Sequence, residues 1–153
     1  MLPMKTQWGA EYQKIYYDVI KKRLPAPFVA MYEKNNWLHD WYLKNYYIAN
    51  TGSFIQAYST AGSSTVQIEL CNAGPNKNIL LIYKNVLEIK VEFKQSTFKS
   101  STKPTGFGQI ITNIFEIDDA SNISHDFIFD EGDRIFIKCK SIGYRRVVED
   151  YWR

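Results

Sequence analysis

The stretch SHDFIFDEGDRIFIKCK, residues 124–140, decides the fold class of this chain. Two sets of side chains alternate along it, on both sides of a short acidic turn. A period of two is typical of a β-strand with one buried face. Gly132 suits the left-handed position of a three- to four-residue hairpin loop. The set that we expect to face inward consists of His125, Phe127, Phe129, Ile135, Ile137 and Cys139.

The same alternation recurs upstream. Val66, Ile68 and Leu70 alternate with polar residues, and so does a second series over residues 87–93. Lys84-Asn85 predicts a bend or bulge just before that second series. The expected strands, about seven, cover residues 37–49, 54–58, 65–72, 78–83 with its continuation 87–93, 107–117, 124–129 and 134–140.

The first 36 residues follow a helical pattern instead. Pro25 ends a first amphipathic helix over residues 8–23, and Pro27 opens a second one through about Asn35. The apolar positions of the first helix recur at spacings of three and four. They are Trp8, Tyr12, Ile15, Tyr16, Val19 and Ile20.

These patterns predict a single α+β domain, residues 1–153, in which antiparallel β-structure dominates. Residues 1–36 form its helical segment and residues 37–148 its antiparallel β core. Short connections favour hairpins over crossovers. We therefore expect a β-sandwich or a strongly curled sheet of about seven strands, with two N-terminal helices.

Composition limits the classes of function. The chain has 153 residues and a net charge of +3, which is mildly basic and does not favour a nucleic-acid partner. The N-terminus lacks an apolar run of signal-peptide length, and no stretch reaches the length of a membrane span. Two cysteines do not make a disulfide framework. We expect a cytoplasmic protein without a membrane partner.

Candidate catalytic and metal-binding residues are few. A zinc site would have to gather the two histidines and two cysteines from separate strands, and no local ligand spacing supports one. Because neighbouring side chains on a strand point to opposite faces, a His-Asp dipeptide in a strand does not act as one unit. We therefore predict no catalytic residues, no metal and no cofactor. The residues weighed are His39, His125, Cys71 and Cys139.

An aromatic cluster offers the strongest candidate for binding. Trp37, Trp41, Tyr42, Tyr46 and Tyr47 lie within eleven residues. Aromatic side chains form hot spots in protein interfaces and stacking platforms for ligands. They also pack helices against sheets, and this alternative stays open. The binding residues predicted from this cluster are Trp37, Trp41 and Tyr46.

Four short motifs carry a resemblance to known proteins: WLHDWYL at 37–43, VQIEL at 66–70, LLIYKNV at 80–86 and HDFIF at 125–129. Together they resemble small bacterial β-rich domains of uncharacterised function, some of them assigned as immunity proteins of polymorphic toxin systems. The resemblance covers about residues 37–148. Its only polar hallmark is the His-Asp dipeptide, which adds His39 and Asp40 to the predicted binding residues. It implies binding of a cognate toxin in the cytosol, without chemistry.

Two classes of function follow as hypotheses. The first is a non-enzymatic protein-binding domain, in its specific form an immunity protein that neutralises a cognate bacterial toxin. The net charge disfavours an inhibitor of basic nucleases unless an acidic surface makes the contact. The second is a small-molecule or glycan-binding β-sandwich that uses the aromatic surface. A homodimer remains an open alternative, because an unprotected edge strand invites pairing.

Overall fold

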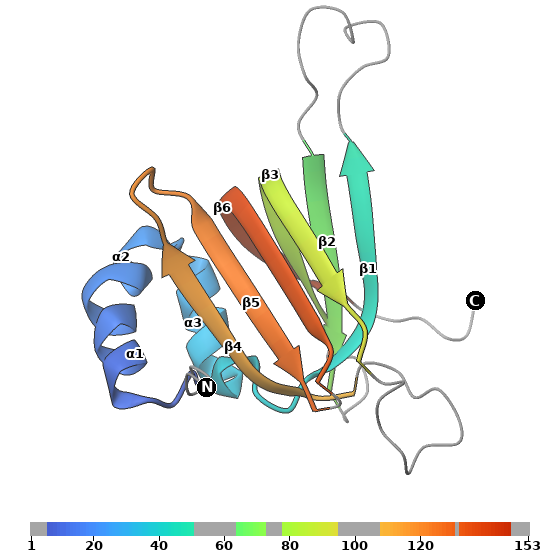
Figure 1. The fold of residues 1–153 in the computed structure, drawn as a ribbon, viewed down its shortest axis with the longest axis horizontal. Helices are drawn as coiled ribbons and strands as arrows, with labels where there is room; N and C mark the ends of the chain where they lie inside the picture. Colours follow the sequence, from blue (N-terminus) through green and yellow to red (C-terminus); the bar gives the residue numbers. More distant parts are fainter. Residues whose placement is uncertain (1–5, 51–63, 73–77, 95–107, 131, 148–153) are drawn as a thin grey trace, which may run out of the picture.

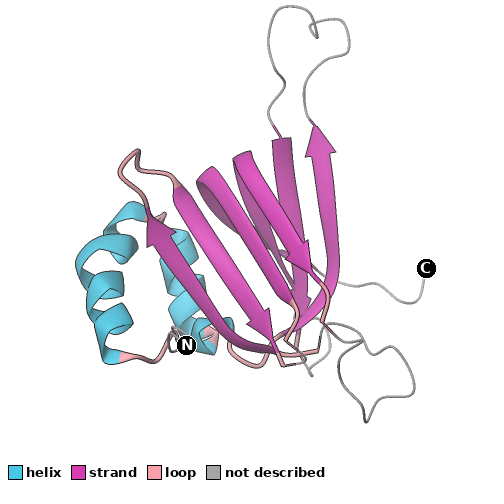
Figure 2. Ribbon diagram, in the orientation of Figure 1, coloured by secondary structure: helices cyan, strands magenta, loops and turns pink. Residues whose placement is uncertain are grey.

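The computed structural model describes residues 6–50, 64–72, 78–94, 108–130 and 132–147. A continuous helix comes first and consists of α1 (Ala10–Ile15), the π-helical segment η1 (Tyr16–Ile20) and α2 (Lys21–Arg23). Helix α3 (Ala26–Lys34) and the short turn η2 (Asn36–Leu38) follow. The strands are β1 (Tyr42–Asn50), β2 (Ser64–Cys71), β3 (Asn78–Glu92), β4 (Ile110–Ile117), β5 (Ile123–Phe129) and β6 (Arg134–Val147) (Figures 1 and 2).

All six strands belong to one antiparallel sheet with the order β1-β2-β3-β6-β5-β4. The two longest strands, β3 and β6, pair along their whole length. Both bend sharply together at the top of Figure 1. At this bend Asn85 has a φ of 53°, and the pairing register of β3 with β6 shifts between Val86 and Glu88. The predicted bend at Lys84-Asn85 is therefore confirmed. The sheet does not close, and its two described edges touch through a bridge between Tyr42 and Gln109.

The expected α+β class with an antiparallel sheet is confirmed. The described residues form six strands where we expected about seven, and the expected strand at 54–58 lies outside them. The described strands form a single bent sheet rather than the two separate sheets of a sandwich, because β3 and β6 run through both halves. None of the described helices is both long and apolar enough to cross a membrane.

The hydrophobic core lies between the helices and one face of the bent sheet. Along β5 buried and half-buried side chains alternate strictly, as the sequence predicts. Phe28 of α3 packs edge-on against Phe115 of β4, with their ring centroids 5.8 Å apart. In Figure 1 the helices lie beside β4, at the opposite end of the sheet from β1. They therefore cover one end of the sheet and leave the other uncovered.

A buried polar network connects the helices to the sheet, and Asn113 of β4 is its centre. The Asn113 Oδ1 atom accepts hydrogen bonds from the Tyr32 hydroxyl and from His125 Nε2, each at 2.8 Å. Its Nδ2 atom donates to the Trp37 carbonyl oxygen at 2.8 Å and to Gln7 Oε1 at 3.1 Å. These residues come from the N-terminal segment, α3, η2, β4 and β5. One amide therefore fixes how five segments sit together.

We predict that Asn113→Ala lowers the free energy of unfolding by about 3 kcal/mol or more, because it leaves several buried groups without partners and opens a cavity. Urea denaturation followed by circular dichroism measures this. Asn45→Ala in β1 is the matched control. The exposed side chain of Asn45 should contribute within about 0.5 kcal/mol. Equal stability of the two variants would contradict the role of the network.

Candidate functional site

The WLHDW segment that the sequence singled out forms a turn, not the start of a strand. Asn36, Trp37 and Leu38 have φ values of 55°, 56° and 61°, and Asp40 has 67°. Non-glycine residues rarely adopt this left-handed conformation, and four within five residues store backbone strain. The expected strand from residue 37 is therefore wrong in its first five residues, and β1 begins at Tyr42.

Core contacts hold this strained turn in place. Leu38 and Trp41 are buried, and the Trp37 carbonyl oxygen accepts hydrogen bonds from Asn113 Nδ2 and Gln7 Nε2. The backbone N–H of Asp40 donates to the Ile110 carbonyl oxygen at 3.0 Å, and that of Ile110 donates to the Trp41 carbonyl oxygen at 2.8 Å. The surrounding structure thus fixes the turn from both sides, as strained backbone requires.

The turn presents His39 and Asp40 at the surface as one unit. The His39 Nδ1 atom lies 3.1 Å from Asp40 Oδ1. We expected these neighbours to point to opposite faces of a strand; the left-handed conformation of Asp40 brings them together instead. The Asp40 side chain is 59% exposed, whereas that of His39 is 28% exposed.

Aromatic residues of the first helix and the preceding turn complete this surface. The indole of Trp8 lies 5.8 Å from the ring of His39 and 5.8 Å from that of Trp37, measured between centroids. The Tyr17 ring lies 6.0 Å from Trp37. Trp8 and Tyr17 are each about half exposed. We call this set, Trp8, Tyr17, Trp37, His39 and Asp40, the helix–turn surface.

The predicted binding residues divide into three groups. Trp37 is 8% exposed and Trp41 is 4% exposed, which favours the packing role that the sequence also allowed. His39 and Asp40 lie together at the helix–turn surface. Tyr46 is exposed on β1, the strand at the far edge of the sheet from the helices. Sequence reasoning had assigned Trp8 to the apolar face of the helix and did not find it as a surface residue.

His125 belongs to the core network. The Asn113 Oδ1 atom can only accept, so His125 Nε2 carries the proton, and His125 Nδ1 accepts a hydrogen bond from the Tyr83 hydroxyl at 2.7 Å. Burial holds the pKa of His125 well below its usual 6.5. The histidine is therefore neutral and fully bonded, an arrangement suited to structure.

Neither cysteine lies in an environment that would activate its thiol. Cys139 is buried in the core, where burial raises its thiol pKa to about 11. Cys71 is half-buried at the end of β2, and its pKa is also raised by burial. Both thiols are thus less acidic than a nucleophilic cysteine requires. Among the described residues no three His, Cys, Asp or Glu side chains gather closely enough to hold a metal ion.

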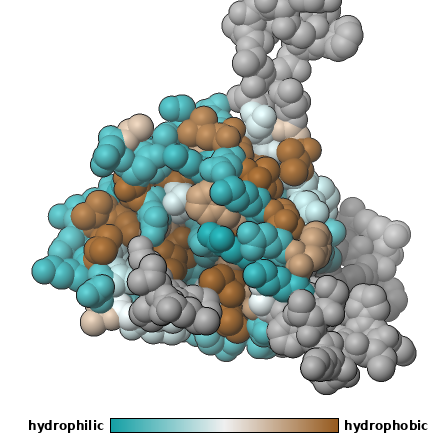
Figure 3. All heavy atoms as spheres, in the orientation of Figure 1, coloured by the Kyte–Doolittle hydropathy of each residue, from teal (hydrophilic) through white to brown (hydrophobic). Residues whose placement is uncertain are grey.

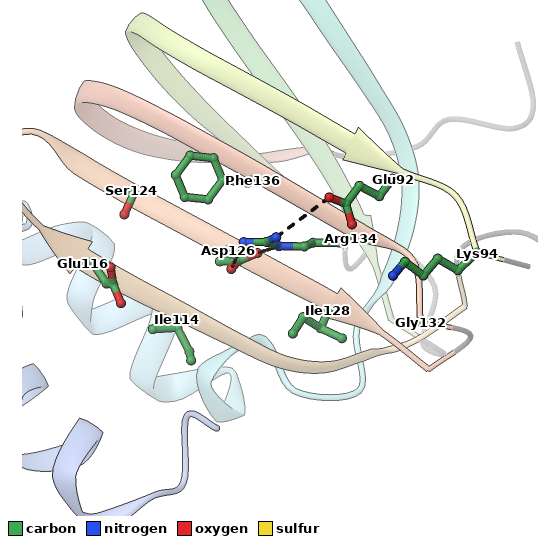
Figure 4. A pocket seen from close by; sticks show the side chains of 10 residues that line it. All are labelled: Glu92, Lys94, Ile114, Glu116, Ser124, Asp126, Ile128, Gly132, Arg134 and Phe136. Carbon is green, nitrogen blue, oxygen red and sulfur yellow. Dashed lines mark hydrogen bonds and ion pairs between the residues drawn. The ribbon is translucent and has the colours of Figure 1, made fainter. Parts of the chain in front are cut away.

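A second candidate site is a depression of about 610 Å³ on the opposite face of the sheet from the helices (Figure 4). Arg134 crosses it and forms two hydrogen bonds with the Asp126 carboxylate, at 2.8 and 2.7 Å. Glu92 lies 3.9 Å from the same guanidinium. The lining residues are Glu92, Lys94, Ile114, Glu116, Ser124, Asp126, Ile128, Gly132, Arg134 and Phe136.

Sequence reasoning missed this depression for a geometric reason. Its side chains come from the outward set of four strands, and each strand alone looks like an ordinary solvated face. Cross-strand pairing puts Glu92 beside Arg134 and Arg134 beside Ile128. In the sequence, the only sign of this depression is the outward-facing polar set of residues in each alternating strand pattern.

Comparison of the chain with protein-family models, with curated proteins and with solved structures finds no match. The site is therefore interpreted from its own geometry.

The depressed pKa of His125 predicts a pH-dependent stability. The unfolded chain binds a proton at His125 near pH 6.5, whereas the folded chain does not, so stability is full above that pH and falls as the pH decreases. From pH 7.5 to 5.5 we expect a loss of about 1.4 kcal/mol from this group.

Urea denaturation at both pH values tests this. His39→Gln should still lose stability between pH 7.5 and 5.5, because His39 lies outside the network. His125→Phe should not show this pH-dependent loss, although the variant is less stable at every pH. A loss that disappears in His39→Gln and persists in His125→Phe would show that His125 is not its source.

Proposed function

We propose that this protein is a non-enzymatic protein-binding domain whose contact residues lie on the helix–turn surface. One observation carries the proposal: a strained turn, fixed by the core, holds His39 and Asp40 beside the half-exposed indole of Trp8. Backbone strain of this kind concentrates at functional sites. A rigid presentation also lowers the entropy cost of association.

The apolar surface of the first helix supports this function. Of its six apolar positions, only Tyr12, Tyr16 and Ile20 are buried in the core. The remaining three are about half exposed, and hydrophobic residues reach the surface at the helical end of the molecule in Figure 3. A partner that covered them would remove apolar area from water. These exposed positions are Trp8, Ile15 and Val19.

The chemistry of the surface indicates what the partner contributes. Trp8 offers an aromatic face, and Asp40 offers an exposed carboxylate. The Tyr17 ring already carries the Lys21 ammonium group, which lies 5.3 Å from its centroid. Aromatic faces and a carboxylate together recognise a cationic side chain through cation–π and charge-assisted contacts. We therefore propose a partner that places a lysine or arginine here, with apolar residues against the helix.

The specific form of this function that we propose is an immunity protein that neutralises a cognate bacterial toxin. It rests on the resemblance of the WLHDWYL, VQIEL, LLIYKNV and HDFIF motifs. Such a role needs a complementary surface and no reactive group. His125 and Cys139, which the core encloses, agree with this requirement.

Isothermal titration calorimetry against the toxin encoded beside this gene tests the proposal. We expect one-to-one binding that Trp8→Ala weakens at least ~30-fold, as a hot-spot residue does. Asp40→Lys should weaken it further than Asp40→Asn, because it repels the cationic side chain. The matched control is Leu87→Ala, because Leu87 is a similarly exposed apolar residue at the bend of β3. Absence of binding, or an equal effect of Leu87→Ala, would contradict the proposal.

The depression of Figure 4 favours a second function, binding of a small molecule or glycan. Its volume of about 610 Å³ lies in the range of ligand sites, about 300–1,000 Å³. Phe136 supplies an aromatic face, and carboxylates and Arg134 supply hydrogen-bonding groups. This aromatic differs from Trp37 and Trp41, the residues that the sequence suggested for such a role.

On this second function, a mono- or disaccharide at millimolar concentration should raise the melting temperature of the protein. Phe136→Ala should abolish that shift, whereas Trp8→Ala should preserve it. A thermal-denaturation screen measures both. A sugar panel that shifts no melting temperature would remove the glycan hypothesis and leave the protein-binding one untouched.

A further inference from the structure

The two edge strands of the sheet differ in how their outer backbone groups are used. On β4 the backbone N–H of Asn113 donates to Gln7 Oε1 at 2.7 Å, and that of Phe115 donates to the Tyr12 hydroxyl at 2.8 Å. Side chains of the N-terminal segment thus occupy the outer edge of β4. Another strand cannot pair there without displacing them.

The outer edge of β1 has no comparable cover among the described residues. Its one contact with another described segment of backbone is the bridge from Tyr42 to Gln109, at the first residue of the strand. Tyr46, Tyr47 and Ile48 are 41%, 47% and 60% exposed. The charge and the bulge that protect an edge strand lie at the start of β1, at Lys44, and the apolar stretch that follows can accept another strand.

The apolar residues of β1 also continue the core side of the sheet. Tyr46 pairs with Ile68 and Ile48 pairs with Val66, and both β2 residues are completely buried. Directly paired residues point to the same face of a sheet. Tyr46 and Ile48 therefore lie on the core side, yet they remain exposed because the helices cover only the other end of the sheet (Figure 1).

We propose that β1 pairs with β1 of a second copy of this chain, antiparallel and centred on Tyr47. The described residues of β1 carry one charge, Lys44. The two-fold arrangement centred on Tyr47 places each Ile48 opposite Tyr46 of the partner subunit, an aromatic–β-branched pair that stabilises sheets. Lys44 is the residue of the β-bulge between Leu43 and Asn45, so it lies outside the regular pairing, which runs from Asn45 to Ala49.

The alternative centre on Tyr46 is less favourable. It would place the bulge at Lys44 opposite Ile48 of the partner subunit, so regular pairing would be limited to residues 45–47. The register centred on Tyr47 therefore uses the whole stretch from Asn45 to Ala49 and places aromatic residues opposite branched ones. A strand of different chemistry would lack this match.

One strand pair makes a modest interface. It buries less than the roughly 1,200–2,000 Å² that is typical of stable complexes. We therefore expect a reversible dimer with a dissociation constant in the micromolar range. Sedimentation velocity of the full chain, from about 1 to 300 μM, should show the monomer of 17.9 kDa giving way to a species of twice that mass.

Two variants and their mixture test the register directly. Tyr46→Lys and Ile48→Glu should each weaken the dimer at least tenfold, because a charge then faces an apolar side chain on both sides of the axis. In an equimolar mixture, the introduced lysine of one subunit faces the introduced glutamate of the other, and the opposite side of the axis keeps the native pair. Association should therefore recover in the mixture, which misfolded variants could not achieve. Leu87→Lys, at an exposed apolar residue of β3, is the matched control and should leave the dimer unchanged.

Three results would overturn the proposal. The first is a wild-type protein that remains monomeric at about 300 μM, as expected if another segment of the chain covers β1. The second is a dimer that neither β1 substitution weakens, which would place the interface elsewhere. The third is a mixture that fails to recover association, which would exclude the register centred on Tyr47.

Discussion

The buried amide of Asn113 is the constraint on which the rest of this structure depends. A polar group removed from water must find hydrogen-bond partners inside the protein. Asn113 finds them in Gln7, Tyr32, Trp37 and His125, which lie on separate segments. Among the described residues every buried side-chain nitrogen and oxygen atom has such a partner. The observed arrangement of the helices, the turn and the sheet satisfies all of these groups at once.

This constraint explains the two surfaces that we connect with function. Asn113 and Gln7 bind the Trp37 carbonyl oxygen and so hold the left-handed turn that presents His39 and Asp40. Gln7 and Tyr12 also occupy the outer edge of β4, which draws the first helix to that end of the sheet. Because the helices are held there, they do not reach β1. The exposed apolar side of β1 is a consequence of where the polar network lies.

Sequence patterns predicted the strands well because each depends on contacts with one face. The alternation in residues 124–140 gives β5, β6 and their hairpin, including Gly132 with a φ of 85°. The strand prediction failed for residues 37–41 because tertiary contacts impose their conformation. No local preference favours Trp37 or Leu38 in the left-handed region. Of the candidate site, His39 and Asp40 were predicted from the resemblance of the WLHDWYL motif, whereas the contact of His39 with Trp8 depends on a segment elsewhere in the chain.

The sequence by itself determined the α+β class, the antiparallel strands and the inward sets of β2 and β5, because hydrophobic periodicity acts residue by residue. The apolar set over residues 87–93 is different, because Leu87 and Phe93 are 52% and 66% exposed. Only the tertiary structure decided which aromatic residues are covered. Trp37 and Trp41 are buried while Trp8, Tyr46 and Tyr47 are exposed, although all five are similarly apolar. Burial depends on which segment packs above a side chain. Which segment packs there follows from long-range hydrogen bonds and from the bend in β3 and β6. No single segment of the sequence encodes either of them.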